Sequence, residues 1–200
     1  MGKNRSKSLR AWEIAALMAL SLALCAGTWA QARQRSISAA LVRLHVIAVS
    51  DTEEEQEIKL HVRDAVLEYL SPVLESAENQ EQARRIITEN LDGIAAAAGS
   101  AAEGRQVRVT LSRESYPTRE YEGFTLPAGR YESLRVILGE GEGKNWWCVV
   151  FPPLCLTAAE AETVKSAMSG EDLSIVTEEE GYLLRFRLVE LWGELLNALS

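Results

Sequence analysis

The chain has 200 residues, of which 47% are hydrophobic and 25% charged, and its formal net charge is -8 at pH 7. These values are typical of one globular domain with a sizeable core. The acidic balance argues against a nucleic-acid-binding protein, because phosphate binding requires clustered Lys and Arg. Three cysteines and two histidines without a CxxC pair leave little material for a metal site, and we expect no cofactor.

The first 32 residues have the pattern of an export signal. An uncharged apolar run over residues 14–30 follows a basic leader, and Ala30-Gln31-Ala32 has the small-x-small form of a signal peptidase site. Cleavage after Ala32 is the favoured interpretation. The alternative is an uncleaved anchor of the same orientation, because about 17 apolar residues are just enough to span a bilayer. Cys25 follows Leu24 rather than a small residue, which indicates a signal-core position and not a lipid attachment site.

After the export signal we expect a spacer over residues 33–40 and one exported domain over residues 41–200. Residues 41–49, LVRLHVIAV, predict a first strand with Val42, Leu44 and Val46 facing the core. The sequence Asp51-Thr52-Glu53-Glu54 has the spacing of a capping box and predicts the start of a helix. Pro72 is expected to end or bend that helix.

The middle of the chain predicts one more helix and three strands. The helix is expected over residues 80–97, with Gly99 as its stop. Apolar and polar residues alternate over 105–112, a short strand is expected within 121–126, and another strand over 131–138.

Residues 139–155, GEGEGKNWWCVVFPPLC, predict a strand that is apolar on both faces, with Trp146 and Trp147 on opposite sides. We expect it to form an antiparallel hairpin with residues 131–138. Burial of both tryptophans is favoured; alternatively, one remains exposed beside the acidic loop and contacts a partner. Two more helices are expected, from Thr157 toward Met168 and from about Gly181 to the end. Together these elements predict a single α/β (α+β) domain with a mixed sheet of about four to five strands.

The residues give little support for catalysis. His45 with Asp51 is thin support for a hydrolase, and no G-x-S-x-G nucleophile elbow occurs. His61 follows Glu57 by four residues, which is typical of a solvated helical pair. The glycine-rich loop carries Glu140 and Glu142, which would repel a phosphate.

Cys148 and Cys155 could form a disulfide in an exported protein. Seven extended residues span about 23 Å, so the bridge requires the chain to turn back at Pro152-Pro153. Two buried free thiols are the alternative.

Four stretches of the sequence together resemble the stage II sporulation protein R family. They are residues 43–51 (RLHVIAVSD), 59–67 (KLHVRDAVL), 126–136 (LPAGRYESLRV) and 143–155 (GKNWWCVVFPPLC). Val49 departs from the Asn expected at the strand-to-helix corner of that family.

The resemblance implies an exported signalling protein of endospore formation that is not an enzyme. Such a protein lies between the forespore and mother-cell membranes. There it triggers a membrane-embedded aspartic protease, stage II sporulation protein GA, to process the sigma-E precursor. No small-molecule substrate is implied, and only the N-terminal segment would meet the membrane. The candidate receptor contacts are Trp146, Trp147, His45 and Asp51. The alternative classes are an extracytoplasmic hydrolase and an envelope-binding module.

Overall fold

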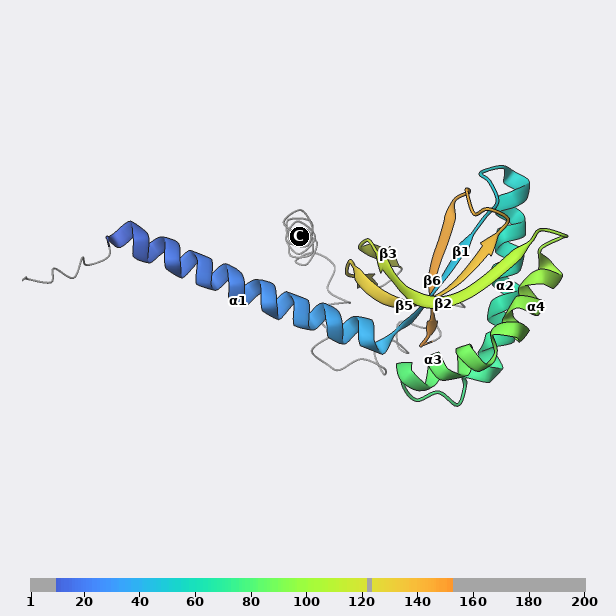
Figure 1. Ribbon diagram of the computed structural model, residues 1–200, viewed down its shortest axis with the longest axis horizontal. Helices are drawn as coiled ribbons and strands as arrows, with labels where there is room; N and C mark the ends of the chain where they lie inside the picture. The colour runs from blue at the N-terminus through green and yellow to red at the C-terminus, as the bar shows by residue number, and fades with distance from the viewer. Residues whose placement is uncertain (1–9, 122–123, 153–200) are drawn as a thin grey trace, which may run out of the picture.

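The computed structural model describes residues 10–121 and 124–152. Within them, a long N-terminal helix leads into a domain in which three helices cover one face of a four-stranded mixed sheet (Figure 1). The predicted α/β class and mixed sheet are confirmed. The helices expected after Thr157 lie outside the described residues.

The sheet places the first strand of the chain at its centre. Its spatial order is β2 (Val107–Tyr116), β5 (Gly129–Leu138), β1 (Val42–Ile47) and β6 (Asn145–Phe151). β1 runs parallel to β5 and antiparallel to β6, and β2 runs antiparallel to β5. The expected hairpin between residues 131–138 and the tryptophan strand is therefore wrong, because β1 lies between these two strands.

The loop from β5 to β6 explains this arrangement. Gly139 and Gly141 adopt φ values of 56° and 72°, which favour glycine and turn the chain sharply after β5. The Gly143 amide then donates to the carbonyl of Ala48 at 2.9 Å, and a Cβ on Gly143 would lie only 2.3 Å from the carbonyl oxygen of Ser50. The loop thus crosses the end of β1 in close contact with its backbone. As a result, β6 pairs with the edge of β1 opposite to the edge that pairs with β5.

Helix α2 (Glu53–Leu74) is capped by Thr52, one residue after the Asp51 that the capping-box spacing predicts. The Thr52 hydroxyl accepts from the Glu55 amide at 3.4 Å, and Glu residues fill the first turn, where negative charge is favourable. Pro72 lies inside the last turn and does not end the helix. The apolar stripe of α2 packs against the sheet; it comprises Ile58, Val62, Val66, Leu67, Leu70 and Leu74.

The single helix expected over residues 80–97 is two helices, α3 (Gln80–Glu89) and α4 (Leu91–Ala101). Asn90 separates them. Its side-chain amide donates to the carbonyl of Ile86 at 2.8 Å and its Oδ1 accepts from the Tyr69 hydroxyl at 3.1 Å. Gly99 is not the helix stop; the turn after α4 instead uses positive φ values at Glu103 and Gly104.

The main core lies between these helices and the sheet. It is contributed by alternate strand residues, among them Val42, Leu44 and Val46 as predicted, and by the inward faces of α2, α3 and α4. Val49, which departs from the expected Asn, packs partly buried against this core. An apolar side chain is therefore suited to that corner.

Strand β2 extends further than predicted, to Tyr116. The short strand expected within 121–126 is a two-stranded sheet of β3 (Arg119–Tyr121) and β4 (Phe124–Leu126). Its two strands lie beyond the end of β2 in sequence, and the Ala128 amide donates to the Thr118 hydroxyl at 3.1 Å where the chain returns to β5.

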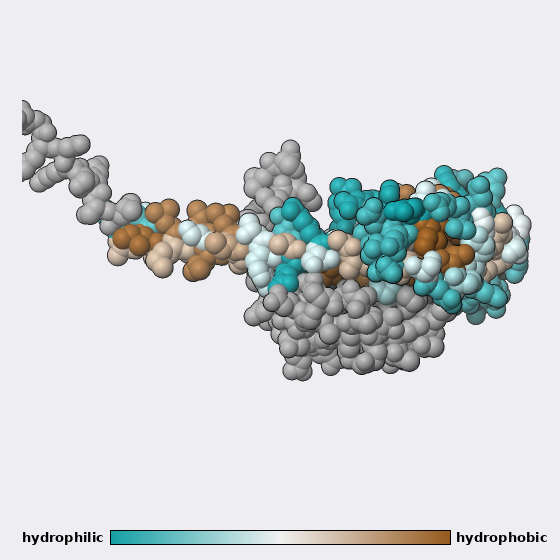
Figure 2. All heavy atoms as spheres, turned by 90° about the horizontal axis from the view of Figure 1, so that it is seen from below, coloured by the Kyte–Doolittle hydropathy of each residue, from teal (hydrophilic) through white to brown (hydrophobic). Residues whose placement is uncertain are grey.

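Helix α1 (Ala11–Ala40) projects from the domain and is apolar along most of its length (Figures 1 and 2). By length and hydropathy it could cross a membrane, a property that signal sequences share. Residues 33–40, expected as a spacer, form its last turns. Ile37 is 1% exposed and belongs to a second core cluster with Leu41, Tyr116, Leu126, Tyr131 and Val149.

Candidate functional site

The face of the sheet opposite the helices carries a cluster of polar and aromatic side chains. Strand alternation places Arg43 and His45 on this face while Val42, Leu44 and Val46 face the core. Neighbouring strands add further members, which we call the polar face cluster together with those two: Glu114, Tyr116, Tyr131, Ser133, Arg135 and Trp147.

Arg43 is fully buried in an aromatic cage. Its guanidinium lies 3.9 Å from the ring centroid of Tyr116 and 5.1 Å from that of Tyr131, and it donates to the Tyr121 hydroxyl. Cation-π contacts favour a desolvated guanidinium because the ring faces are electron-rich. Burial raises the pKa of Tyr116, Tyr121 and Tyr131, so the three hydroxyls stay protonated around the cation. The cage joins β1 to β2, β5 and the β3–β4 hairpin.

His45 belongs to a hydrogen-bonded network centred on Glu114. Its Nδ1 lies 3.0 Å from Glu114 Oε2, which also accepts from the Ser133 hydroxyl at 3.0 Å. Glu114 Oε1 forms an ion pair with Arg135 at 3.1 Å, and the Ser133 hydroxyl contacts the Tyr116 hydroxyl at 2.6 Å. This network ties β1, β2 and β5 together across the sheet.

The network does not have the order of a hydrolase triad. A nucleophilic serine must contact the imidazole, which in turn contacts the carboxylate. Here Ser133 contacts the carboxylate of Glu114 directly. Asp51, the proposed partner of His45, instead accepts from the Lys144 amide at 2.7 Å. Among the described residues, no group of three His, Cys, Asp or Glu side chains could hold a metal ion.

The two tryptophans of β6 lie on opposite sides of the sheet, as predicted. Trp147 is half-buried in the polar face cluster, 5.5 Å from the ring of His45, with the Arg119 guanidinium 3.9 Å from its own centroid. Trp146 lies on the helix side, where the Arg63 guanidinium of α2 is 4.5 Å from its ring. It is 37% exposed, so the expectation that both tryptophans are buried is wrong. The helices leave its ring uncovered at the edge of the core.

The remaining predicted contacts differ in accessibility. His45 is 7% exposed and is engaged by Glu114, so it is not presented on the surface. Asp51 is exposed at the corner between β1 and α2, where its carboxylate fixes the crossing loop through the Lys144 amide. Lys59 supports the same corner by donating to the Lys144 carbonyl at 3.2 Å, and burial lowers its pKa. Of the four candidate contacts, the structure brings Trp147 and His45 together, whereas Trp146 and Asp51 lie elsewhere. Their role as receptor contacts stays a prediction.

Cys148 is disulfide-bonded, and Cys25 is a free, exposed thiol on α1. Cys155 lies outside the described residues. Its pairing with Cys148 therefore stays a prediction.

Comparison with known proteins gives the family. A family model described as stage II sporulation protein R matches residues 38–161. The chain belongs to this family. It is 37% identical to the stage II sporulation protein R of Bacillus subtilis strain 168 over 143 residues, which is 69% of this chain and 64% of that protein. The chain thus matches less than two thirds of the relative's length. No solved structure matches it.

The family match begins in the last turn of α1 and includes all the strands and the helices α2, α3 and α4 of the described residues. It covers the whole sheet, the polar face cluster and both tryptophans. Sequence reasoning missed the Arg43 cage, although one signal was present. Arg43 is a cation in a strand of mostly apolar residues, a place where a charge needs buried partners. The aromatic partners come from residues 116–131, which no local pattern connects to residue 43.

Proposed function

We propose that this chain is the exported signal that triggers a membrane-embedded aspartic protease, stage II sporulation protein GA, to process the sigma-E precursor. Membership of a sporulation family is the observation that carries the proposal. The N-terminal helix that could cross a membrane supports a site of action outside the cytoplasm.

The polar network on the sheet and the exposed Trp146 support a protein that acts by binding a partner protein. On the sheet, Glu114 is hydrogen-bonded to both His45 and Ser133, an order that does not activate the serine as a nucleophile. Trp146 is a large aromatic ring exposed next to a cation, the residue types that most often dominate binding energy at protein interfaces. We therefore place the receptor contact at Trp146 and Arg63.

Reconstitution in a non-sporulating bacterium tests the function. The protease, the sigma-E precursor and this chain are produced together, and the fraction of precursor cleaved is measured by immunoblot. We expect cleavage only when all three proteins are present and this chain is exported. A variant without residues 1–32 stays in the cytoplasm and serves as the matched control. Uncleaved precursor in the presence of all three proteins, with this chain shown to be exported, would contradict the proposal.

A further inference from the structure

The dimensions of α1 match those of a bilayer. The segment between Glu13 and Arg33 contains about 19 uncharged residues, which rise about 28 Å as a helix and equal the hydrocarbon thickness. Trp12 and Trp29, 64% and 51% exposed, are separated by about 26 Å along the axis. Tryptophans are enriched at both interfaces of a membrane, so the two rings mark the expected boundaries of a span.

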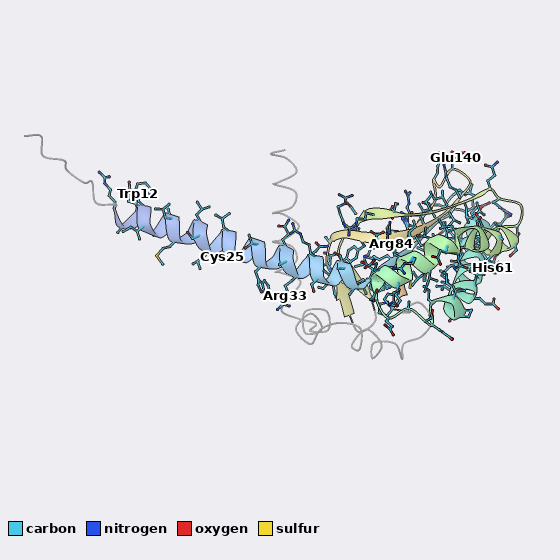
Figure 3. All side chains as sticks on the ribbon, turned by 60° about the horizontal axis from the view of Figure 1, so that its bottom comes forward. Trp12, Cys25, Arg33, His61, Arg84 and Glu140 are labelled. Atoms are coloured by element: carbon cyan, nitrogen blue, oxygen red, sulfur yellow. The ribbon has the colours of Figure 1, made fainter. Side chains whose placement is uncertain are left out.

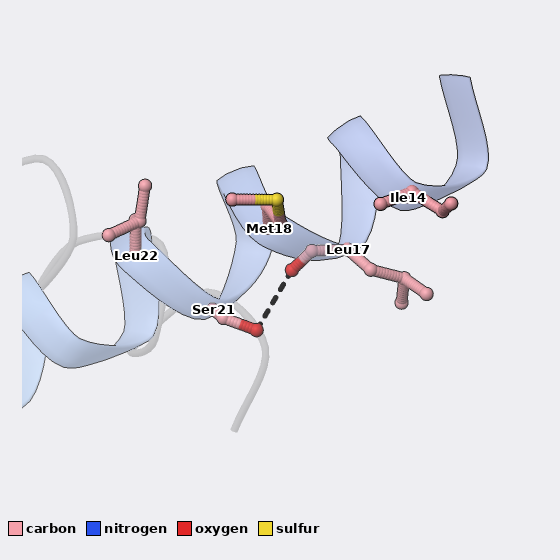
Figure 4. A pocket seen from close by; sticks show the side chains of 5 residues that line it. All are labelled: Ile14, Leu17, Met18, Ser21 and Leu22. Carbon is pink, nitrogen blue, oxygen red and sulfur yellow. Dashed lines mark hydrogen bonds between the residues drawn. The ribbon is translucent and has the colours of Figure 1, made fainter. Parts of the chain in front are cut away.

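The hydroxyl groups of Ser21 and Thr28 within this segment are satisfied by the helix backbone. The Ser21 hydroxyl donates to the carbonyl of Leu17 at 2.8 Å, and the Thr28 hydroxyl donates to the carbonyl of Cys25 at 2.9 Å. Figure 4 shows the first of these bonds in a shallow hollow lined by apolar side chains, namely Ile14, Leu17, Met18 and Leu22. A lipid-facing helix requires this internal satisfaction, because hydrocarbon offers no hydrogen-bond partner.

The end of α1 is built into the folded domain. Gln80 at the start of α3 donates to the carbonyls of Ser38 and Leu41 at 2.7 and 2.5 Å. Ile37 is buried, and Gln34 packs so closely on β5 that a Cβ on Gly129 would lie 1.8 Å from its Nε2. The helix therefore passes from the apolar segment into the domain without a flexible linker.

The predicted cleavage motif lies inside this continuous helix. A small-x-small motif presents two side chains on the same side only when the chain is extended, because side chains two apart share a face with period two. In α1, Ala30 and Ala32 point in different directions around the helix axis.

We propose that α1 is retained as a single bilayer span and that it holds the exported domain on the lipid headgroups. The binding partner of the apolar surface of α1 is the lipid bilayer. Arg33 stacks over Trp29, with its guanidinium 5.7 Å from the ring centroid, at the level where a cation reaches lipid phosphate. Figure 3 shows Trp12, Cys25 and Arg33 along the part of α1 that extends away from the domain. The proposal does not depend on the signalling role.

Intact mass after fractionation tests retention. The full chain is produced in a bacterial host, membranes are washed with alkaline carbonate, and the protein is weighed by mass spectrometry. We expect the complete 22.1 kDa chain in the washed membranes. Ala32→Leu, which removes the small residue at the motif, is the uncleaved standard and should show the same fractionation. A soluble species beginning at Arg33, or full-length protein released by carbonate, would overturn the proposal.

Cys25 reports on the span directly, because it lies about 6 Å inward from Trp29 along the helix. A membrane-impermeant maleimide should leave Cys25 unlabelled in intact cells and label it after detergent is added. Ser112→Cys, at an exposed position on β2, should be labelled in both conditions. Labelling of Cys25 without detergent, or its absence from the exported protein, would refute the span.

Discussion

At the scale of single residues, burial and exposure depend on partners distant in sequence. Alternation along β6 correctly predicts that Trp146 and Trp147 face opposite sides. It does not predict that Trp146 lies at the edge of the helix layer, since this depends on where α2 places Arg63. The Arg43 cage was likewise beyond local patterns, because its tyrosines come from strands far along the chain.

Trp146 and Arg63 should matter for signalling more than for folding. Trp146→Ala or Arg63→Ala is expected to weaken the proposed complex with the protease by about 2 kcal/mol, a roughly 30-fold loss of affinity. The free energy of unfolding should change by less than about 1 kcal/mol, because each side chain is partly exposed. Precursor cleavage in the reconstituted system and urea unfolding measure the two effects.

Two variants serve as controls for this pair. Arg85→Ala removes an exposed arginine from α3 and should leave cleavage unchanged. Trp147→Ala removes a half-buried ring and should lower stability by about 2 kcal/mol. If the precursor is cleaved as fully in the presence of Trp146→Ala as in the presence of Arg85→Ala, the contact is not at Trp146.

The tyrosine cage predicts loss of stability at alkaline pH. Burial raises the folded pKa of Tyr116, Tyr121 and Tyr131 above the unfolded value of about 10. The unfolded chain then releases these protons first. Their contribution is fully present below pH 10 and is lost as the pH rises through the raised values, by about 1.4 kcal/mol per pH unit for each tyrosine. Urea unfolding between pH 8 and 11 measures this slope, and Tyr116→Phe should reduce it. An equal slope in Tyr116→Phe would contradict the role of burial at that residue.

At the scale of elements, the sequence predicted the existence of helices and strands better than their ends and neighbours. The start of α2 was predicted to within one residue because the capping signal, a polar residue followed by glutamates, is local. The break at Asn90 was missed because it depends on a tertiary hydrogen bond from Tyr69. Strand order was missed for a similar reason: a turn of suitable length favours pairing of consecutive strands, and nothing local indicates that β1 inserts between β5 and β6.

Two glycines of α4 form a matched test of the contact between α2 and α4. A Cβ on Gly93 would lie 2.0 Å from the Tyr69 hydroxyl, whereas nothing lies within 4 Å of a Cβ on Gly99. Gly93→Ala should therefore lower the free energy of unfolding by about 1 to 3 kcal/mol through overpacking. Gly99→Ala should raise it by up to about 1 kcal/mol through helix propensity. Chemical denaturation compares the two, and equal effects would show that Tyr69 moves aside freely.

At the scale of the whole molecule, the number of free thiols shows which cysteines are bridged. Cys148 is disulfide-bonded and Cys25 is free. If Cys148 pairs with Cys155 within the chain, the full-length protein contains one alkylatable thiol under denaturing, non-reducing conditions and three after reduction. Cys155→Ser should then release a second thiol. Three thiols before reduction would exclude the bridge.

The central position of β1 constrains the proposed export. Val42 would leave an export channel early, yet it pairs with Glu132 on one side and Phe151 on the other. Contacts of such large sequence separation form slowly, because a long loop must close first. Under the proposed export, the sheet could not assemble until β6 had crossed the membrane, so the domain would cross as an unfolded chain and fold on the far side.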